Sequence, residues 1–374
     1  MFFRRFFFRA ALIFAITAIV VASAAVRASD RIPSEISDSA FWKLISSMSE
    51  PDGQFRYENF LSNELQYQYV IPSLQSATQR GGAYLGVGPE QNFTYIAALK
   101  PGIAFITDIR RQNMVELMMY KAIFELAPTR ADFVSMLFSK KRPEGISDKT
   151  SVDQLFRAFV KVERDPELQQ SNLEAIQNQL MQKHQFGMSL SDVQNIGYVH
   201  HIFFKDGPSM DYSAGDHGTA PNSGMPSYLE LMVADDDHGA NRSFLATEEN
   251  YRFVRDMQLK NLIVPLVGDF AGPKTIRAIG QYLKDHDSAV SAFYVSNVEQ
   301  YLYSDGKLLD FFNNVATLPM TSSSTFIQSF GPNGGGAAFT GGNGFQSMTS
   351  SMMEVVKVCA VRGCDYSVVR QMSK

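Results

Sequence analysis

A glycine-containing turn between two apolar segments restricts most strongly how this chain can fold. The first segment, 83–87, is apolar and contains Gly86, and Gly88 follows it directly before a helical pattern begins. The second segment, 103–109, carries Asp108 near its end. A glycine turn after one strand and an acidic residue at the tip of the next are typical of Rossmann-type folds, which hold an adenosine-containing ligand there. The sequence therefore predicts a nucleoside site formed by this turn and Asp108.

Strand and helix patterns continue to alternate along the chain. This alternation predicts an α/β fold with a Rossmann-like, mostly parallel sheet flanked by helices. The predicted Rossmann domain spans residues 81–330, and its second strand is followed by a helix at 113–126. Further strands are expected at 228–234, 262–267, 290–295 and 324–330, with helices at 92–99, 248–259 and 274–284 and around Phe311.

Three segments are expected to lie outside the alternating pattern. Residues 29–80 form a mainly helical lead-in, which includes a helical pattern at 59–75. Residues 331–374 combine a glycine-rich segment at 331–344, which has the composition of a linker, with a C-terminal helix. The third segment is a helical insertion, described next.

The helical insertion occupies about residues 128–226. Its helices are expected at 131–138, 152–162, 167–184 and 190–204. The insertion ends in a loop, 206–226, that is rich in Gly, Ser, Pro and Asp. Such a loop either closes over a ligand as a lid or is a surface excursion without a role.

The N-terminus has the order of regions found in secretory signals. Arg4, Arg5 and Arg9 precede an apolar run at 10–22, and small residues follow, so we expect a signal peptide at 1–28. The arginine pair also resembles a twin-arginine export signal. We therefore expect an exported protein, periplasmic or secreted, that meets the membrane only through this signal. An uncleaved N-terminal anchor is the alternative.

Composition and cysteine content exclude some classes of function. The chain has 374 residues, 45% hydrophobic and 19% charged, which suits one large globular domain with insertions or two domains. Its formal net charge of −4 offers no basic surface for nucleic acid. Cys359 and Cys364 are the only cysteines. In an oxidising compartment we expect them to form a disulfide, and two unpaired thiols are the alternative.

The polar residues at the carboxyl ends of the strands are the candidates for chemistry, because ligands bind at that edge of a parallel sheet. Arg110 and Arg111 would suit a phosphate or carboxylate, or would pair with Glu116 at the surface. The acidic turn 235–237 could hold a hard cation, but a solvated turn is the favoured interpretation, and we expect no metal site. No motif of a zinc hydrolase or serine hydrolase occurs. The remaining candidates are Gly86, Gly88, Gln91 and Asn92 after the first strand, Asp108 after the second, and Asp269, Asn297 and Glu299 after later strands.

At 84–88 and Asp108 the chain resembles class I S-adenosylmethionine-dependent methyltransferases. The segments 86–96, 241–246, 267–273 and 296–302 are similar to a narrower family of uncharacterised bacterial proteins placed near those methyltransferases. The resemblance implies that the glycine turn approaches the methionine part of S-adenosylmethionine and that Asp108 takes the ribose hydroxyls. It also implies that the end of the fourth strand faces the reacting groups.

Two positions depart from the methyltransferase pattern. Tyr84 stands where that family has an acid, and Glu90 stands where it has a third glycine. Only Gly86, Gly88 and Asp108 match residues of the methyltransferase pattern at the same positions. Asp269 matches that pattern less closely.

The leading hypothesis is a methyltransferase-like protein that binds S-adenosylmethionine or a related nucleoside. If it is catalytic, Asp269, Asn297 or Glu299 would position the methyl acceptor or act as base. Because S-adenosylmethionine is made in the cytoplasm, the signal implies an anchor that faces inward, export with a bound ligand, or a fold reused for another purpose. The alternative is therefore a non-catalytic exported protein that binds another small-molecule ligand or acts in envelope interactions.

Overall fold

The computed structural model describes residues 31–78, 80–219, 224–331, 344–362 and 364–374. The signal or anchor expected at 1–28 and most of the glycine-rich segment 331–344 lie outside the described residues. Within the described ranges, no helix is both long enough and apolar enough to cross a membrane.

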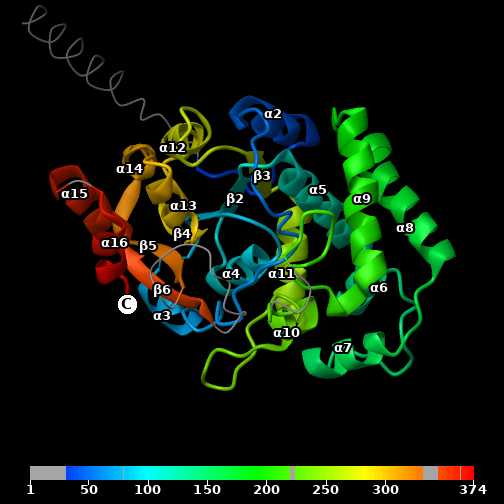
Figure 1. Ribbon diagram of the computed structural model, residues 1–374. Coiled ribbons are helices and arrows are strands. Elements are labelled where there is room, and N and C mark those ends of the chain that lie inside the picture. Colours follow the sequence, from blue (N-terminus) through cyan, green and yellow to red (C-terminus); the bar gives the residue numbers. More distant parts are fainter. Residues whose placement is uncertain (1–30, 79, 220–223, 332–343, 363) are drawn as a thin grey trace, which may run out of the picture.

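The described strands form one six-stranded sheet in the order β3-β2-β1-β4-β5-β6 (Figure 1). Neighbouring strands from β3 to β5 run parallel, and only β6 runs antiparallel to its neighbour, β5. The strands are β1 (Ala83–Gly86), β2 (Ile103–Asp108), β3 (Ile263–Val267), β4 (Val290–Ser296), β5 (Met320–Phe330) and β6 (Gln346–Ser351). This topology confirms the predicted α/β, Rossmann-like fold with a mostly parallel sheet.

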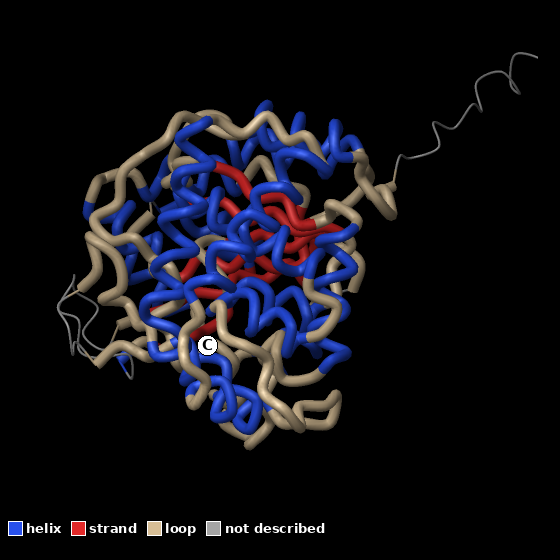
Figure 2. The backbone as a smooth tube through the Cα atoms, turned by 90° about the vertical axis from the view of Figure 1, so that its right-hand side faces the viewer, coloured by secondary structure: helices blue, strands red, loops and turns tan. Residues whose placement is uncertain are grey.

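Helices cover both faces of the sheet, as Figure 2 shows. On one face Tyr95 of α4 packs its ring against Tyr84 of β1 and Tyr294 of β4. On the other, Phe311 of α14 packs against Phe293 of β4 and Phe326 of β5. The helices of the core and lead-in are α2 (Asp38–Met48), α3 (Ile71–Ala77), α4 (Gln91–Leu99), α5 (Arg111–Leu126), α10 (Tyr228–Val233), α11 (Glu248–Leu259), α12 (Thr275–Asp285), α13 (Val298–Ser304), α14 (Leu308–Val315), α15 (Met352–Arg362) and α16 (Tyr366–Met372).

Coverage on both faces explains why the central strands have no polar side. Every residue of β1, β2 and β3 is buried, as expected for parallel strands between two helical layers. Strand β1 pairs with β2 on one side and with β4 on the other. The strand order therefore reverses beside β1, and in open α/β sheets ligands bind at this switch point.

The inserted helices pack beside the sheet. They are α6 (Arg130–Phe138), α7 (Val152–Val160), α8 (Pro166–Asn178) and α9 (Leu190–Asp206), with a π-helical turn at Gln179–Lys183 and a short 3₁₀ turn at Gly207–Ser209. Figure 1 shows α6–α9 on the side of the molecule opposite α15 and α16. Both α8 and α9 contact α5. The helices of this segment therefore form a layer stacked outside α5.

The strand predicted at 228–234 is wrong, because these residues form helix α10. Ser227 caps that helix, and Glu230 completes the capping box by accepting from the Ser227 backbone nitrogen. The acidic turn 235–237 thus follows a helix. Within it, the buried Asp236 forms an ion pair of 2.7 Å with Arg242, which gives this carboxylate a structural partner.

The helix predicted at 59–75 is also wrong over most of its length. Only α3, beginning at Ile71, is helical, and Pro72 occupies its first turn. Before it the chain forms turns, and the side chains of Glu64 and Gln68 point into the protein and are buried. Gln68 donates to the carbonyl of Ala234 at 3.0 Å. These long-range polar contacts hold an irregular backbone that helical spacing alone does not reveal.

The C-terminal segment is part of the sheet. Strand β6 pairs antiparallel with β5, and α15 packs on β5. The backbone of Lys374 exchanges two hydrogen bonds with Thr349 of β6, at 2.8 and 2.9 Å. Strand β6 is not predicted from the sequence, because Gln346–Ser351 is mainly polar and lacks an apolar run.

Candidate functional site

A cavity of about 210 Å³ lies at the carboxyl ends of the central strands. Four of the residues that line it come at the ends of four different strands: Gly88 after β1, Asp108 at the end of β2, Asp269 after β3 and Asn297 after β4. The cavity therefore sits where the strand order reverses, the usual ligand position in this class of sheet.

The structure separates the eight predicted site residues into two groups. Five of them line the cavity: Gly88, Gln91, Asp108, Asp269 and Asn297. Gly86, Asn92 and Glu299 are absent from its wall. The first two shape the glycine turn, and Glu299 belongs to a different buried network.

Gly86 and Asn92 fix the shape of the turn. A Cβ atom on Gly86 would lie 1.9 Å from the Asn92 side-chain oxygen, so only glycine fits. The Asn92 amide donates to the carbonyls of Val87, Gly88 and Pro89 at 2.9, 3.1 and 2.8 Å. Gly88 has a φ of +76°, a conformation that favours glycine. The turn is thus held from behind and presents Gly88 to the cavity.

Asp108 is a buried carboxyl at the cavity wall. Its Oδ1 accepts a hydrogen bond of 3.0 Å from the backbone nitrogen of Arg110. Burial raises the pKa of Asp108, while the charge of Arg110 opposes that rise. The Arg110 guanidinium donates to the carbonyl of Glu58, and Arg111 pairs with Asp192 at 2.6 Å. Both arginines are therefore engaged by the protein, and neither lines the cavity.

Gln91 belongs to a chain of polar groups in the cavity wall. Its amide donates to the Tyr294 hydroxyl at 3.0 Å, and that hydroxyl donates to the Glu64 carboxyl at 2.8 Å. Ser296 also donates to Glu64. Glu64 is not among the predicted site residues, because the segment that carries it has helical spacing and no motif.

Asp269 and Asn297 lie on the same cavity but have different surroundings. Asp269 accepts from the backbone of Ala271 at 2.9 Å, and its other oxygen lies 3.4 Å from the Lys307 ammonium. The Asn297 side-chain oxygen accepts from Ser296 at 3.4 Å. Of these two residues, Asp269 already has a cationic partner, which reduces its availability as a base.

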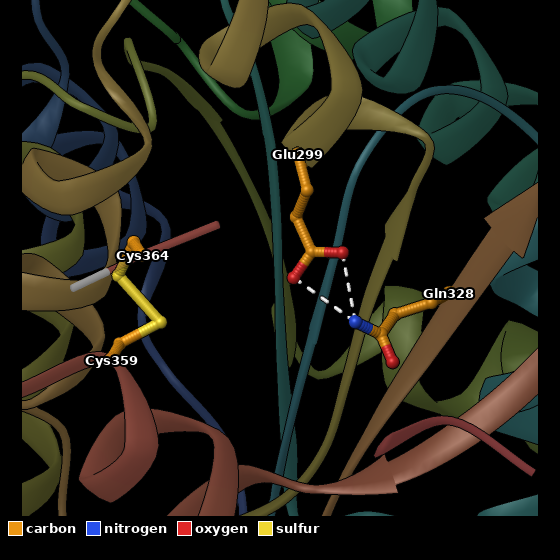
Figure 3. Close-up of a disulfide and its surroundings, with 4 residues drawn as sticks. All are labelled: Glu299, Gln328, Cys359 and Cys364. Atoms are coloured by element: carbon orange, nitrogen blue, oxygen red, sulfur yellow. Dashed lines mark hydrogen bonds between the residues drawn. A yellow bond between two sulfur atoms is a disulfide. The ribbon is translucent and has the colours of Figure 1, made fainter. Parts of the chain in front are cut away.

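Glu299 points away from the cavity, into the packing between α13 and β5. Both of its carboxyl oxygens accept from the Gln328 amide, at 3.1 and 2.8 Å (Figure 3). Burial raises the pKa of Glu299 to about 7. Gln328 in turn accepts from Ser350 of β6 and from Ser373, at 2.7 and 2.9 Å. Glu299 therefore anchors the C-terminal segment.

The two cysteines also secure the C-terminal region. Cys359 and Cys364 form a disulfide between α15 and the residues before α16, which Figure 3 shows near Glu299. The bridge closes a short loop, as the sequence analysis favours.

The insertion reaches the cavity through Tyr212. The Tyr212 hydroxyl donates to the Asn59 side chain. The loop that carries Tyr212 is fastened by Glu58, whose Oε2 accepts from the Tyr198 hydroxyl at 3.1 Å and from the His217 backbone at 3.0 Å. The helices of the insertion thus do not cap the cavity, but one loop of the insertion closes part of it.

Replacing Glu58 by Ala should loosen this loop. A charged acceptor with two donors typically contributes about 1.5–3 kcal/mol, so we expect the amide of His217 to exchange with solvent about 10- to 100-fold faster. Hydrogen–deuterium exchange on peptides covering 211–219 measures this. Gln112→Ala is the matched control, because it removes the donor to the other Glu58 oxygen and the acceptor of an Arg110 N–H but keeps the Glu58 bonds to Tyr198 and His217. If the loop amides exchange equally slowly in Glu58→Ala and in the native protein, Glu58 does not hold this loop in place.

The size and charge of the cavity limit what it can hold. Its volume is below the roughly 300–1,000 Å³ of most cofactor pockets, so a single nucleoside suits it better than a dinucleotide. The acidic and basic side chains that line the cavity are the carboxyls of Glu64, Asp108, Asp269 and Asp305 and one cation, Lys307. Rings from Phe55, Tyr212, Phe270, Tyr294 and Tyr301 supply flat apolar surfaces. The wall therefore favours a flat ligand with hydroxyl or cationic groups.

The described fold and this cavity define a Rossmann-like α/β protein with a compact acidic site at the strand switch point. The chain belongs to the family described as a domain of unknown function, DUF7790, whose model matches residues 59–373. The matched range includes the insertion and the C-terminal strand and helices, which agrees with their packing on the core. No curated protein matches the chain.

Proposed function

We propose that the cavity binds S-adenosylmethionine or a related nucleoside. The observation that carries the proposal is the meeting of Gly88 and the buried Asp108 at one cavity, at the point where the strand order reverses. In this class of fold, a glycine turn lets the ligand approach the backbone and an acid after β2 accepts from ribose hydroxyls. Gly88 and Asp108 would have these two roles here.

A methyl transfer in this cavity would depend mainly on alignment. The methyl carbon would pass from the sulfonium to a nucleophile on the acceptor, and S-adenosylhomocysteine would leave. Asp269 and Asn297 would orient the acceptor, because both line the cavity beyond the glycine turn. Glu299 has no part in this proposal, since its carboxyl is bound to Gln328. Holding the two reactants in line is the contribution that such a site can make.

Binding is tested by calorimetry on the purified protein with S-adenosylmethionine, S-adenosylhomocysteine and adenosine. We expect saturable binding of at least one of them. Absence of heat for all three at millimolar concentration would overturn the proposal.

Replacing Asp108 by Asn should weaken adenosine binding by about 10- to 100-fold. The reason is that hydrogen bonds to a charged acceptor contribute roughly 1.5–3 kcal/mol. The loss should shrink below about threefold for 2′,3′-dideoxyadenosine, which lacks the ribose hydroxyls. Asp305→Asn is the control, because Asp305 is an exposed carboxyl at the same cavity and does not follow β2. The same loss for both ligands would contradict the role of Asp108.

A non-catalytic ligand-binding protein is the second candidate. It is favoured by the ion pair between Asp269 and Lys307 and by the position of Glu299 outside the cavity. Both leave few free bases beside a bound acceptor. Native mass spectrometry of protein isolated from its own compartment separates the candidates. A co-purifying mass other than an adenosyl compound supports this second function, and methylation of a substrate pool by the protein removes it. The same preparation reports whether residues 1–28 are present, and so tests the proposed export signal.

A further inference from the structure

Glu64 is a buried carboxyl in the cavity wall with no cationic partner. Its side chain is almost completely buried, yet it contributes to the lining of the cavity. None of the ion pairs among the described residues involves Glu64, and Lys307, the cation in the cavity wall, pairs with Asp269. A buried carboxylate is costly unless a cation or enough hydrogen-bond donors compensate for the lost water.

The donors around Glu64 compensate it only in part. The hydroxyls of Tyr294 and Ser296 both donate to Oε1. Oε2 has no hydrogen-bond partner within the described ranges. Burial raises the pKa of Glu64, and the hydroxyls of Ser296 and Tyr294 oppose that rise. One carboxyl oxygen is thus oriented by the protein while the other lacks a donor.

The supports of Glu64 are themselves held in place. Gln91 donates to the Tyr294 hydroxyl, and so directs the Tyr294 proton toward Glu64. The Tyr294 ring packs on Tyr95 of α4 at a centroid distance of 5.2 Å. A rigid, oriented carboxylate with one unpartnered oxygen is the arrangement that a site for an amino group requires.

We propose that Glu64 is the anionic anchor for a cationic amino group of the ligand. The natural ligand is then a nucleoside that carries a primary ammonium group, placed between Glu64 and the aromatic rings of the cavity. This inference rests on the proposed function and narrows its ligand class. The ammonium group donates to Oε2 and supplies the charge that Glu64 lacks. The nearby faces of tyrosine rings also favour a cation.

Proton release provides a test that needs no variant. A carboxyl whose pKa is raised retains its proton in the free protein at pH values just above its ordinary range. An ammonium group binds the ionised form, so binding must expel that proton. Affinity for the cationic ligand should therefore increase as pH rises above about 4.5, and should level off once Glu64 is ionised in the free protein. Calorimetry in two buffers with different ionisation enthalpies counts the protons released.

The probes are S-adenosylhomocysteine, which has the ammonium group, and 5′-methylthioadenosine, which does not. Glu64→Gln should weaken S-adenosylhomocysteine binding by about 10- to 100-fold and change 5′-methylthioadenosine binding less than about threefold. It should also abolish the proton release. Asp310→Asn, which replaces an exposed carboxyl of α14 outside the cavity wall, should leave both affinities within about threefold.

The outcomes separate this inference from the proposed function. If both probes bind the native protein but Glu64→Gln weakens them equally, or if no proton is released, Glu64 is not an ammonium anchor while the nucleoside site stands. If neither probe, nor adenosine, binds the native protein, the proposed function fails first and this inference fails with it. If only the ammonium-bearing probe loses affinity and proton release disappears, the inference holds.

Discussion

Replacing Glu90 by Gln should stabilise the protein by about 4 kcal/mol at pH 8 and hardly change its stability at pH 4. Glu90 follows the glycine turn and is completely buried, with its Oε1 accepting from the backbone of Ser62 at 3.2 Å. Its other oxygen has no hydrogen-bond partner in the described part of the chain. Burial raises the pKa of Glu90 from its ordinary value of 4.5 to about 8.

The direction of this effect follows from proton binding. The carboxyl of Glu90 ionises near pH 4.5 in the unfolded chain but retains its proton up to about pH 8 in the folded protein. Between these values the unfolded state binds fewer protons, so the native protein loses stability as pH rises. Gln resembles the protonated carboxyl, can still accept from Ser62, and does not ionise. The advantage of the variant should therefore grow across this window and then level off.

A second buried carboxyl lies near Glu90. Glu116 is also completely buried, and neither of its carboxyl oxygens has a hydrogen-bond partner among the described residues. Burial raises the pKa of Glu116, and the nearby Glu90 raises it further. Two carboxyls that share one buried space cannot both ionise without repulsion. Removing one of them should thus relieve the other.

Denaturant unfolding at several pH values, followed by circular dichroism and by the fluorescence of Trp42, measures the effect of Glu90→Gln. Glu299→Gln is the matched comparison, because the pKa of Glu299 is raised only to about 7. Its advantage should stop growing at a lower pH than that of Glu90→Gln. A difference in stability that does not depend on pH, or one that shrinks as pH rises, would contradict the assignment of a protonated Glu90.

The sequence was sufficient to predict the centre of the fold. Gly86, Gly88 and Asp108 lie where the alternation of apolar segments and turns puts them, because parallel strands between two helical layers require continuous apolar runs. The same pattern brought Asp269 and Asn297 to one edge of the sheet. The carboxyl ends of parallel strands all lie at the same edge of the sheet, so residues that follow these strands could be predicted to lie near one another.

The rest of the cavity could not be predicted in this way. Glu64 and Tyr212 reach the cavity from irregular segments whose conformation depends on contacts distant in sequence. The sequence also does not show which way a side chain at the start of a helix points. Glu299 lies only two residues after Asn297, yet it points to Gln328. Helix α10 is different, because its capping box, Ser227 with Glu230, is visible in the sequence. That signal argues for a helix and against the predicted strand.

Combining Gly86→Ala with Asn92→Ala should destabilise the protein much less than the sum of the two single changes. Gly86→Ala alone places a methyl group against the Asn92 side-chain oxygen. It should displace Asn92 from its contacts, at a cost of about 3–4 kcal/mol. Asn92→Ala alone removes the donor to three turn carbonyls and the acceptor of the Tyr84 hydroxyl, which should cost about 3 kcal/mol.

In the double variant the new methyl group occupies space that Asn92 has vacated. We expect a total loss of about 3–4 kcal/mol, and hence a coupling of roughly 3 kcal/mol between the two sites, measured by urea unfolding. Gly280→Ala combined with Asn92→Ala is the control. A Cβ atom added at Gly280 would approach the carbonyl of Thr317 instead, so this pair should be additive within about 0.5 kcal/mol. Additivity for Gly86 and Asn92 as well would mean that Gly86 is required for another reason. Strong coupling would show that Gly86 is glycine because of Asn92, which stands behind the turn and leaves Gly88 to face the cavity.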